Sequence, residues 1–310
     1  MQAEGGAARA ATSPRFRPGR WFDRALPFLL LAPAMLLIAV VLLYPLVLSI
    51  RISLFAKMLG FPERFVGLEN YGKVISDQVF LNSVRVTFIW TVGSVAGQMV
   101  LGIGLALLLN RAFPGRAFYR TLFLLPWAIP NFIAALTWVW MFSDRFGIIS
   151  SLLMRAHLVS EPVLFLANPN LSLASIILVN IWKNYAFVMI VIMAALQAIP
   201  DELYEAAHVD GASGLQELWS ITLPLIKPMI MIVLLLRIIW TFNTFELIFI
   251  MTEGGPARQT ELLSITAFLW AFRNGITGMG STLGVILLGV TIVFCALYVR
   301  AYARSLRGEQ

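Results

Sequence analysis

Three ionisable side chains lie inside stretches of sequence that are otherwise strongly apolar. They are Lys183, Arg237 and Glu246. A charged group inside a membrane costs roughly 2.5–3.5 kcal/mol unless it is paired or hydrated, so each is a candidate functional residue. Two interpretations stay open: the charges bind a polar solute, or they form structural ion pairs between helices or with a partner subunit.

A solute rich in hydroxyl groups is bound by hydrogen-bonding side chains that stand beside a flat apolar wall. Such side chains recur near the three charges at the spacing of a helix face. On one expected helix the positions i, i+3, i+4 and i+7 are Asn180, Lys183, Asn184 and Phe187. The candidate residues of a solute path are Asn184, Tyr185, Trp240, Asn243 and Glu246.

Arg237 and Glu246 are nine residues apart on the same expected helix. In a straight helix they would lie on opposite faces and roughly 13.5 Å apart along the axis, so they could not pair with each other. Asn243 shares the face of Glu246, whereas Trp240 and Thr244 share the face of Arg237. Each charge therefore requires a partner from another helix, a second subunit or a solute.

Residues that would support catalysis or metal binding are sparse. The one cysteine, Cys295, lies in an apolar run, and His157 and His208 are far apart in the sequence. The chain has no G-x-x-x-x-G-K-[ST] phosphate loop, so it cannot bind ATP in that mode. We expect no catalytic residue, no metal site and no cofactor.

The composition indicates a chain that uses lipid as its solvent. Of its 310 residues, 59% are hydrophobic and 13% are charged, and the mean hydropathy is +0.83. Soluble globular chains are about 25% charged. The net charge of +7 is spread over loop ends, which favours contact with lipid head groups over nucleic acid.

Apolar runs of about 20 residues predict six transmembrane helices and an all-α polytopic membrane protein. Pro126 and Pro130 predict a kink in the third helix. The spacing of Gly93 and Gly97 permits close helix contact, which we interpret as packing within the bundle rather than as a dedicated dimer seam. The six predicted spans are 26–50, 84–109, 119–142, 171–197, 228–251 and 281–302.

Arginines gather near one set of helix ends, which predicts the orientation in the membrane. They place both termini and the segment 198–227 in the cytoplasm. Residues 1–24 are then a basic cytoplasmic tail, 25–303 the transmembrane domain, and 304–310 a second cytoplasmic tail. The arginines are Arg9, Arg15, Arg17, Arg20, Arg24, Arg111, Arg116, Arg120, Arg300, Arg304 and Arg307.

The segment 198–227 predicts two short helices joined by a glycine turn. Pro200, followed by two carboxylates, is typical of a helix start. Gly211 can adopt the left-handed conformation that ends such a helix. Ser213 begins a capping-box pattern for a second helix, which Pro224 is expected to stop. We expect both helices to lie under the membrane rather than to cross it.

Five carboxylates precede the first lysine of this segment, which is unusual on the positive side of a membrane protein. Such a patch requires water or a basic partner. A solvated loop with an interfacial helix remains an alternative, but the two caps and the turn favour a rigid docking element. The five are Asp201, Glu202, Glu205, Asp210 and Glu217.

The same segment resembles a motif of ABC importer permeases. The motif, EAA-x3-G-x9-I-x-L-P, is matched without a gap by Glu205-Ala206-Ala207, Gly211 and Ile221-Thr222-Leu223-Pro224. Thr252-Glu253-Gly254-Gly255-Pro256 and the weaker Gly67-Leu68-Glu69-Asn70-Tyr71 resemble the carbohydrate-uptake branch, which includes maltose, trehalose and glycerol-3-phosphate permeases. Glu253 departs from that pattern, because many relatives have glycine there.

The resemblance implies a type I ABC importer permease fold in the plasma (inner) membrane. It implies that a second homologous permease, two ATPase subunits and an external solute-binding protein act with this chain on a carbohydrate-type solute. It also implies a coupling helix that seats in the ATPase, where Glu205 meets a basic residue. The implied coupling residues are Glu205, Ala206, Ala207, Asp210, Gly211, Leu223 and Pro224.

Two other functional classes remain as alternatives. A secondary transporter would predict inverted repeats and broken helices near the membrane midplane, and the sequence indicates neither. A membrane-embedded enzyme would need an acid–base or metal constellation at a membrane face, and no carboxylate cluster of suitable spacing lies outside the segment 198–227. Binding-protein-stimulated ATP hydrolysis would distinguish the importer from both.

Overall fold

The computed structural model describes residues 20–307, with side chains for 26–304. The chain divides into two compact units, residues 1–49 and 50–310. Most of the predicted basic tail at 1–24, and the end of the predicted tail at 304–310, lie outside the described residues.

The first unit is a helical run that leads into the second unit. It consists of α1 (Arg20–Ile38), the π-helical turn η1 (Ala39–Leu43) and most of α2 (Tyr44–Ser53). Leu26–Ser53 is long and apolar enough to cross a membrane, and none of its most apolar window is buried. Side chains such as Phe28, which is 77% exposed, therefore require lipid or another protein as their surroundings.

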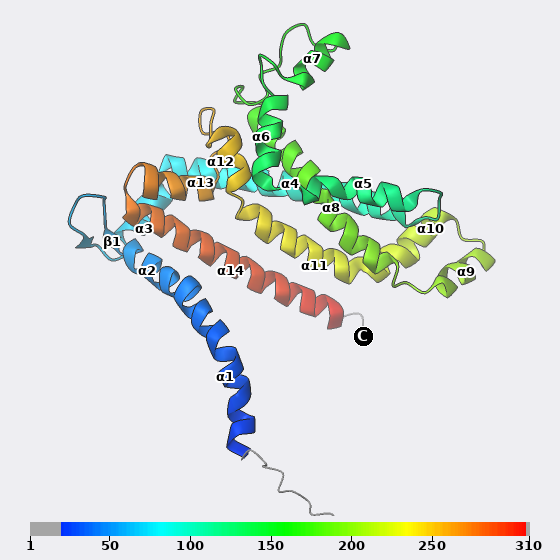
Figure 1. Ribbon diagram of the computed structural model, residues 1–310, viewed down its shortest axis with the longest axis horizontal. Helices are drawn as coiled ribbons and strands as arrows, with labels where there is room; N and C mark the ends of the chain where they lie inside the picture. Colours follow the sequence, from blue (N-terminus) through cyan, green and yellow to red (C-terminus); the bar gives the residue numbers. More distant parts are fainter. Residues whose placement is uncertain (1–19, 308–310) are drawn as a thin grey trace, which may run out of the picture. The chain divides into compact units, whose positions relative to one another are not determined.

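In the second unit, three helices form the centre. These are α4 (Gln78–Asn110), α8 (Ser172–Leu196) and α11 (Leu223–Phe242), which pack against one another. Their shared core contains fully buried side chains such as Val188, Met189 and Ile192. The last helix, α14 (Thr277–Arg307), lies beside α11 (Figure 1).

Glycines allow α4 and α8 to approach closely. A Cβ atom on Gly102 would lie 2.5 Å from Val188 Cβ and 2.8 Å from the Tyr185 carbonyl oxygen. A Cβ atom on Gly97 would overlap the Ile181 side chain. The interpretation of these small residues as packing within the bundle is therefore confirmed.

Short elements close the two ends of this helical core (Figure 1). One end carries α9 (Asp201–Val209) and α10 (Gly214–Glu217). The other carries α3 (Glu69–Ser76), α13 (Leu263–Phe268), η3 (Leu269–Arg273) and the antiparallel pair β1 (Phe55–Ala56) and β2 (Arg64–Phe65). These two-residue strands are the only ones in residues 20–307, so the all-α prediction is confirmed.

The third predicted span is sharply broken. It consists of α5 (Arg116–Ala128) and α6 (Asn131–Met141), which are bent by 92°. Pro130 causes the break because its ring fixes φ and supplies no N–H to the preceding turn. Beyond α6 lies the short α7 (Ile148–Arg155). Residues 20–307 thus contain five continuous candidate spans, or six if this bent pair counts as one.

The fifth span differs from the prediction at both ends. It was expected over 228–251, but α11 ends at Phe242 and α12 (Glu246–Thr252) begins a new direction. Residues 247–251 are apolar because Leu247, Ile248 and Met251 pack in a protein core with α6 and α8, not because they cross lipid. The straight-helix geometry for Arg237 and Glu246 is therefore wrong, as is the expectation of unbroken helices.

Pro224 does not stop the helix that precedes it. The run from Gly214 to Phe242 is continuous through α10, the π-helical turn η2 (Leu218–Thr222) and α11. In η2 the Leu223 N–H bonds the Leu218 carbonyl, five residues back, and this wider turn accommodates the proline ring. The second helix of the segment 198–227 thus continues into the candidate membrane span, contrary to the prediction that it is a separate short helix ended by Pro224.

Candidate functional site

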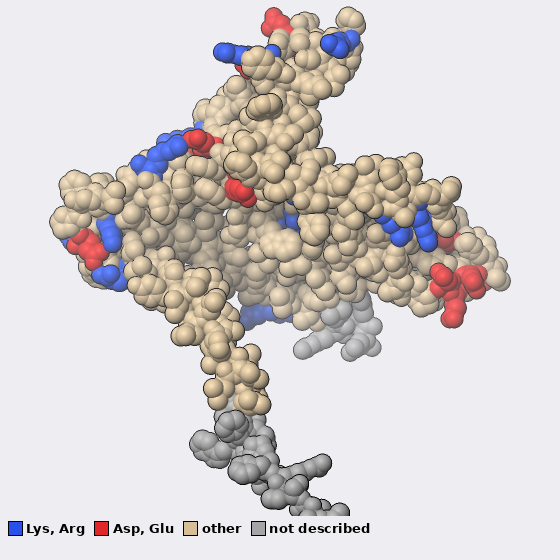
Figure 2. All heavy atoms as spheres, viewed as in Figure 1, with Lys and Arg blue, Asp and Glu red and all other residues tan. Residues whose placement is uncertain are grey.

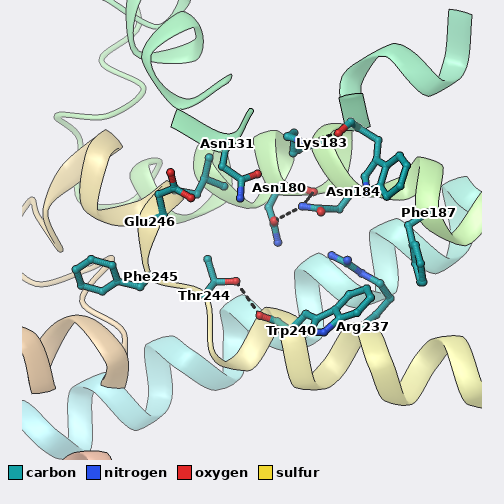
Figure 3. Close-up of a pocket in the computed structure, with 12 residues that line it drawn as sticks. Asn131, Asn180, Lys183, Asn184, Phe187, Arg237, Trp240, Thr244, Phe245 and Glu246 are labelled. Carbon is teal, nitrogen blue, oxygen red and sulfur yellow. Dashed lines mark hydrogen bonds between the residues drawn. The ribbon is translucent and has the colours of Figure 1, made fainter. Parts of the chain in front are cut away.

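A cavity of about 480 Å³ lies where the two broken spans meet α8 (Figure 3). The break between α5 and α6 contributes one side, and the break between α11 and α12 contributes another. Its walls carry both aromatic rings and polar side chains, as a hydroxylated solute requires. The lining residues are Trp127, Asn131, Asn180, Lys183, Asn184, Phe187, Arg237, Trp240, Thr244, Phe245, Glu246 and Leu247.

Arg237 is held from behind by α4. Its Nε donates a hydrogen bond of 2.7 Å to Gln98 Oε1, and Gln98 Nε2 donates to the Asn180 carbonyl at 3.2 Å. The guanidinium carbon lies 5.6 Å from the centroid of the Trp240 ring. Arg237 is 4% exposed, so its charge is stabilised by a neutral amide and a ring rather than by a carboxylate.

Lys183 bonds a backbone carbonyl that has no helical partner because the third span is broken. Its Nζ donates a 3.0 Å hydrogen bond to the Trp127 carbonyl oxygen. In an unbroken helix that oxygen would accept from the N–H of Asn131, but the bend at Pro130 turns α6 away. The proline break therefore provides the lysine with its partner.

The asparagines of α8 differ in how far their hydrogen bonds are satisfied. Asn184 Nδ2 donates to the carbonyl and to Oδ1 of Asn180, at 3.1 Å and 2.7 Å. Asn180 is 3% exposed, and its own Nδ2 has no hydrogen-bond partner. Figure 3 shows this nitrogen pointing into the cavity, toward α11.

Glu246 begins α12 and is exposed. Within residues 26–304 its carboxylate makes no hydrogen bond or ion pair. Thr244, just before it, donates from Oγ1 to the Trp240 carbonyl oxygen at 3.1 Å. Because α12 turns away from α11, the carboxylate reaches the same cavity as Arg237, which a straight helix would prevent.

Five of the predicted intramembrane residues line the cavity: Lys183, Asn184, Arg237, Trp240 and Glu246. Two others do not. Tyr185 is buried against α5, where its hydroxyl donates to the Phe123 carbonyl at 2.9 Å. Asn243 caps α11 on the exposed side, and its amide donates to the Ile239 carbonyl at 2.9 Å.

Sequence reasoning missed the contributions of α4, α5 and α6. Gln98 was not singled out, although a glutamine inside a long apolar span is a signal of a buried polar contact. Trp127 and Asn131 flank Pro130, and the proline pair at the kink was the available signal for them. Proline breaks expose backbone and side chains at membrane depth only where these line a cavity or protein.

A second candidate site is the turn between α9 and α10, which we call the elbow (residues 201–217). α9 ends at Val209, and Gly211, two residues on, has the left-handed φ of +77°. Ala212 N–H then bonds the Ala207 carbonyl at 2.9 Å, which satisfies the helix end. The Ser213 N–H donates to Gln216 Oε1 at 2.7 Å, as the capping-box pattern predicted.

The elbow presents an acidic and apolar surface. Glu205, Ala206, Asp210 and Gly211 are exposed, Ala207 is half-buried, and Figure 2 shows acidic side chains gathered at the α9 end. Glu217 lies 3.0 Å from His208 Nε2. Leu223 is half-buried and Pro224 exposed in the first turn of α11. The most exposed large apolar side chains of the elbow are Val209 and Leu215, at 88% and 67% exposure, and Trp219 follows it at 66%.

Known proteins resemble this chain over most of its length. The family model for the binding-protein-dependent transport system inner membrane component matches residues 98–307. The sulfoquinovosyl glycerol transport system permease protein SmoG of Agrobacterium fabrum is 37% identical, over 91% of this chain and 92% of its own. The trehalose/maltose transport system permease protein MalF of Thermococcus litoralis is 34% identical, over 91% and 95%.

A solved structure is also similar. It is that of a bacterial ABC transporter involved in the import of the acidic polysaccharide alginate. The similarity has a TM-score of 0.82 at 25% sequence identity, and it covers 92% of this chain and 98% of the matched chain.

Proposed function

The chain belongs to the family of binding-protein-dependent transport system inner membrane components, and we propose that it forms half of the translocation path of an ATP-driven importer for a sugar or related polar solute. It is a multi-pass membrane permease subunit, and the family description makes its transport dependent on a binding protein. The relatives named above carry a sulfoquinovosyl glycerol, trehalose or maltose, and alginate.

The cavity at the two helix breaks is the observation that carries the proposal. Sugars present hydroxyl groups around a ring whose faces are partly apolar. Asn131, Asn184 and Glu246 supply hydrogen-bonding groups, and Trp127 and Trp240 supply aromatic walls. Catalysis would require a reacting group hydrogen-bonded to an acid–base partner, whereas within residues 26–304 neither Lys183 nor Glu246 is hydrogen-bonded to another ionisable group.

The shape and surface of the elbow favour a mechanical role for the end of the helical bundle at which it lies. A rigid, exposed turn with acidic and apolar groups is suited to seat in a partner. We propose that this partner is one of two ATPase subunits, that a second homologous permease closes the other side of the path, and that Glu205 meets a basic residue of the ATPase. Leu223 and Pro224 would pass the movement into α11, since η2 connects the elbow to that span directly.

Basic residues near the elbow end support one orientation in the membrane. Arg116 and Arg120 lie in the first turns of α5, whose start lies toward the elbow end, and α14 runs toward the same end (Figure 1) with Arg300 and Arg304 in its last turns. Basic residues near helix ends favour the cytoplasmic side. We therefore propose that the elbow and both termini face the cytoplasm and that the opposite end receives the solute-binding protein.

Reconstitution in lipid nanodiscs with the cognate permease, ATPase and binding protein tests this function. We expect the solute-loaded binding protein to stimulate ATP hydrolysis and the same assembly in vesicles to accumulate the solute. Uptake by this chain alone under an ion gradient would instead support a secondary transporter. Chemical conversion of the solute without uptake would support an enzyme.

Glu205→Lys is expected to weaken binding to the isolated ATPase subunit on the order of tenfold, because it adds repulsion to a lost ion pair. Glu205→Gln should weaken it less. The measurement is the dissociation constant of the detergent-solubilised permease for the ATPase. Glu161→Lys, an equal charge change on an exposed residue after α7, is the control. Equal affinity of both Glu205 variants and the wild type would show that this acid is merely solvated.

A further inference from the structure

The cavity carries more positive than negative charge. Of its twelve lining residues, Lys183 and Arg237 are basic and Glu246 is acidic. Neither base forms an ion pair with that acid: Lys183 bonds a backbone carbonyl and Arg237 a neutral amide. The excess positive charge therefore stays available to whatever occupies the cavity.

Hydrogen-bond donors are also in excess beside Arg237. Only its Nε has a hydrogen-bond partner within residues 26–304, so the two terminal nitrogens of the guanidinium are free to donate. Asn180 Nδ2, in a side chain that is 3% exposed, is a second donor without a partner. Figure 3 shows the Asn180 amide and the Arg237 guanidinium pointing into the same space between α8 and α11.

The unpaired donors of Arg237 and Asn180 are best satisfied by a negatively charged acceptor. A buried donor without a partner is costly, and a buried arginine binds a carboxylate or phosphate through two parallel N–H···O bonds. Glu246, on the far side of the cavity at the start of α12, is placed to accept hydrogen bonds from hydroxyl groups instead. The cavity thus has an end suited to an acid group and an end suited to hydroxyl groups.

We propose that Arg237 and Asn180 bind an acid group of the transported solute, which is a saccharide or polyol bearing a carboxylate, phosphate ester or sulfonate. Lys183 adds positive charge beside this site, and Glu246 binds the hydroxylated part. This inference rests on the proposed transport function. The names of the similar proteins include both a neutral solute, trehalose or maltose, and an acidic one, alginate.

The charge of the cavity is tested without knowledge of the solute. In a Cys295→Ser background of the assembled complex, Thr244→Cys places one thiol in the cavity wall. Its modification rates are measured with an anionic and a cationic methanethiosulfonate, sulfonatoethyl and trimethylammonioethyl. The anionic-to-cationic rate ratio should exceed that of a free small thiol on the order of tenfold. Asn131→Cys, on the α6 side, is measured in parallel.

Charge variants provide the matched controls for this ratio. Arg237→Gln should lower the ratio at position 244 about threefold or more, Arg237→Lys should keep it, and Glu246→Gln should raise it. A ratio at both cysteines no higher than that of the free thiol would overturn the inference. So would a ratio that does not respond to Arg237→Gln.

Matched solute pairs then separate this inference from the proposed function. In the reconstituted complex, uptake is compared for cellobiose against cellobionate and for glycerol against sn-glycerol-3-phosphate. We expect the acidic member of a pair to be accumulated at least tenfold faster, and Arg237→Gln to abolish that preference. Faster uptake of the neutral members would overturn the inference and leave the transport function intact. If the solute-loaded binding protein did not stimulate ATP hydrolysis, the proposed function would be contradicted, while the thiol ratio would still report on the charge of the cavity.

Discussion

Gly211→Val is expected to lower transport and binding-protein-stimulated ATP hydrolysis together, while the permease still inserts and assembles. Gly211 has a φ of +77°, and a β-branched side chain in the left-handed region costs about 1–2 kcal/mol. A Cβ atom there would meet nothing within 4 Å, so the cost is backbone strain rather than a clash. Because 1.4 kcal/mol corresponds to roughly a tenfold change in a population, transport and stimulated ATPase activity should fall together about tenfold.

Gly211→Asn is the matched control, because asparagine adopts the left-handed conformation more readily than other residues. It should retain most of the transport rate. Both activities are measured in nanodiscs and vesicles at equal permease content. Normal transport by Gly211→Val would remove the proposal that the elbow must keep its shape to transmit movement.

The elbow could be predicted from the sequence because local interactions determine it. A helix start, a left-handed glycine and a capping box each involve residues within five positions of one another. The part that failed was the consequence of Pro224. Sequence rules treat proline as a helix stop, but the π-helical turn Leu218–Thr222 accommodates it and continues the helix into α11.

The cavity could be predicted only in part, because its walls come from distant segments. Polar side chains inside apolar spans identified Lys183, Arg237 and Glu246. Their partners, Gln98 on α4 and the Trp127 carbonyl on α5, depend on how the helices pack, and no local pattern reports this.

The break after Phe242 was hidden for a similar reason. Residues 247–251 are as apolar as a membrane span, and hydropathy does not distinguish burial in protein from burial in lipid. Only tertiary packing directs α12 against α6. The direction of α12 decides which side chains reach the cavity. Glu246 lines the cavity, whereas Asn243, three residues earlier, does not.

Gln98→Leu is expected to lower the stability of the permease, because it leaves a buried arginine without its hydrogen-bond acceptor. Gln98 is fully buried, and its Oε1 lies 2.7 Å from Arg237 Nε. Removing one partner of a hydrogen bond to a charged group costs about 2 kcal/mol. The apparent unfolding midpoint of the detergent-solubilised chain should therefore fall by roughly 4–8 °C.

Ser94→Ala is the control on the same helix, one turn before Gln98. Ser94 is also fully buried, but its hydroxyl has no hydrogen-bond partner. Its removal should leave the midpoint unchanged or raise it slightly, since no partner is orphaned. The double variant Gln98→Leu with Arg237→Met should recover most of the loss, because both polar partners are then replaced by apolar groups of similar size. If Gln98→Leu is as stable as Ser94→Ala, the amide does not support Arg237, and the arginine must be stabilised from the cavity side.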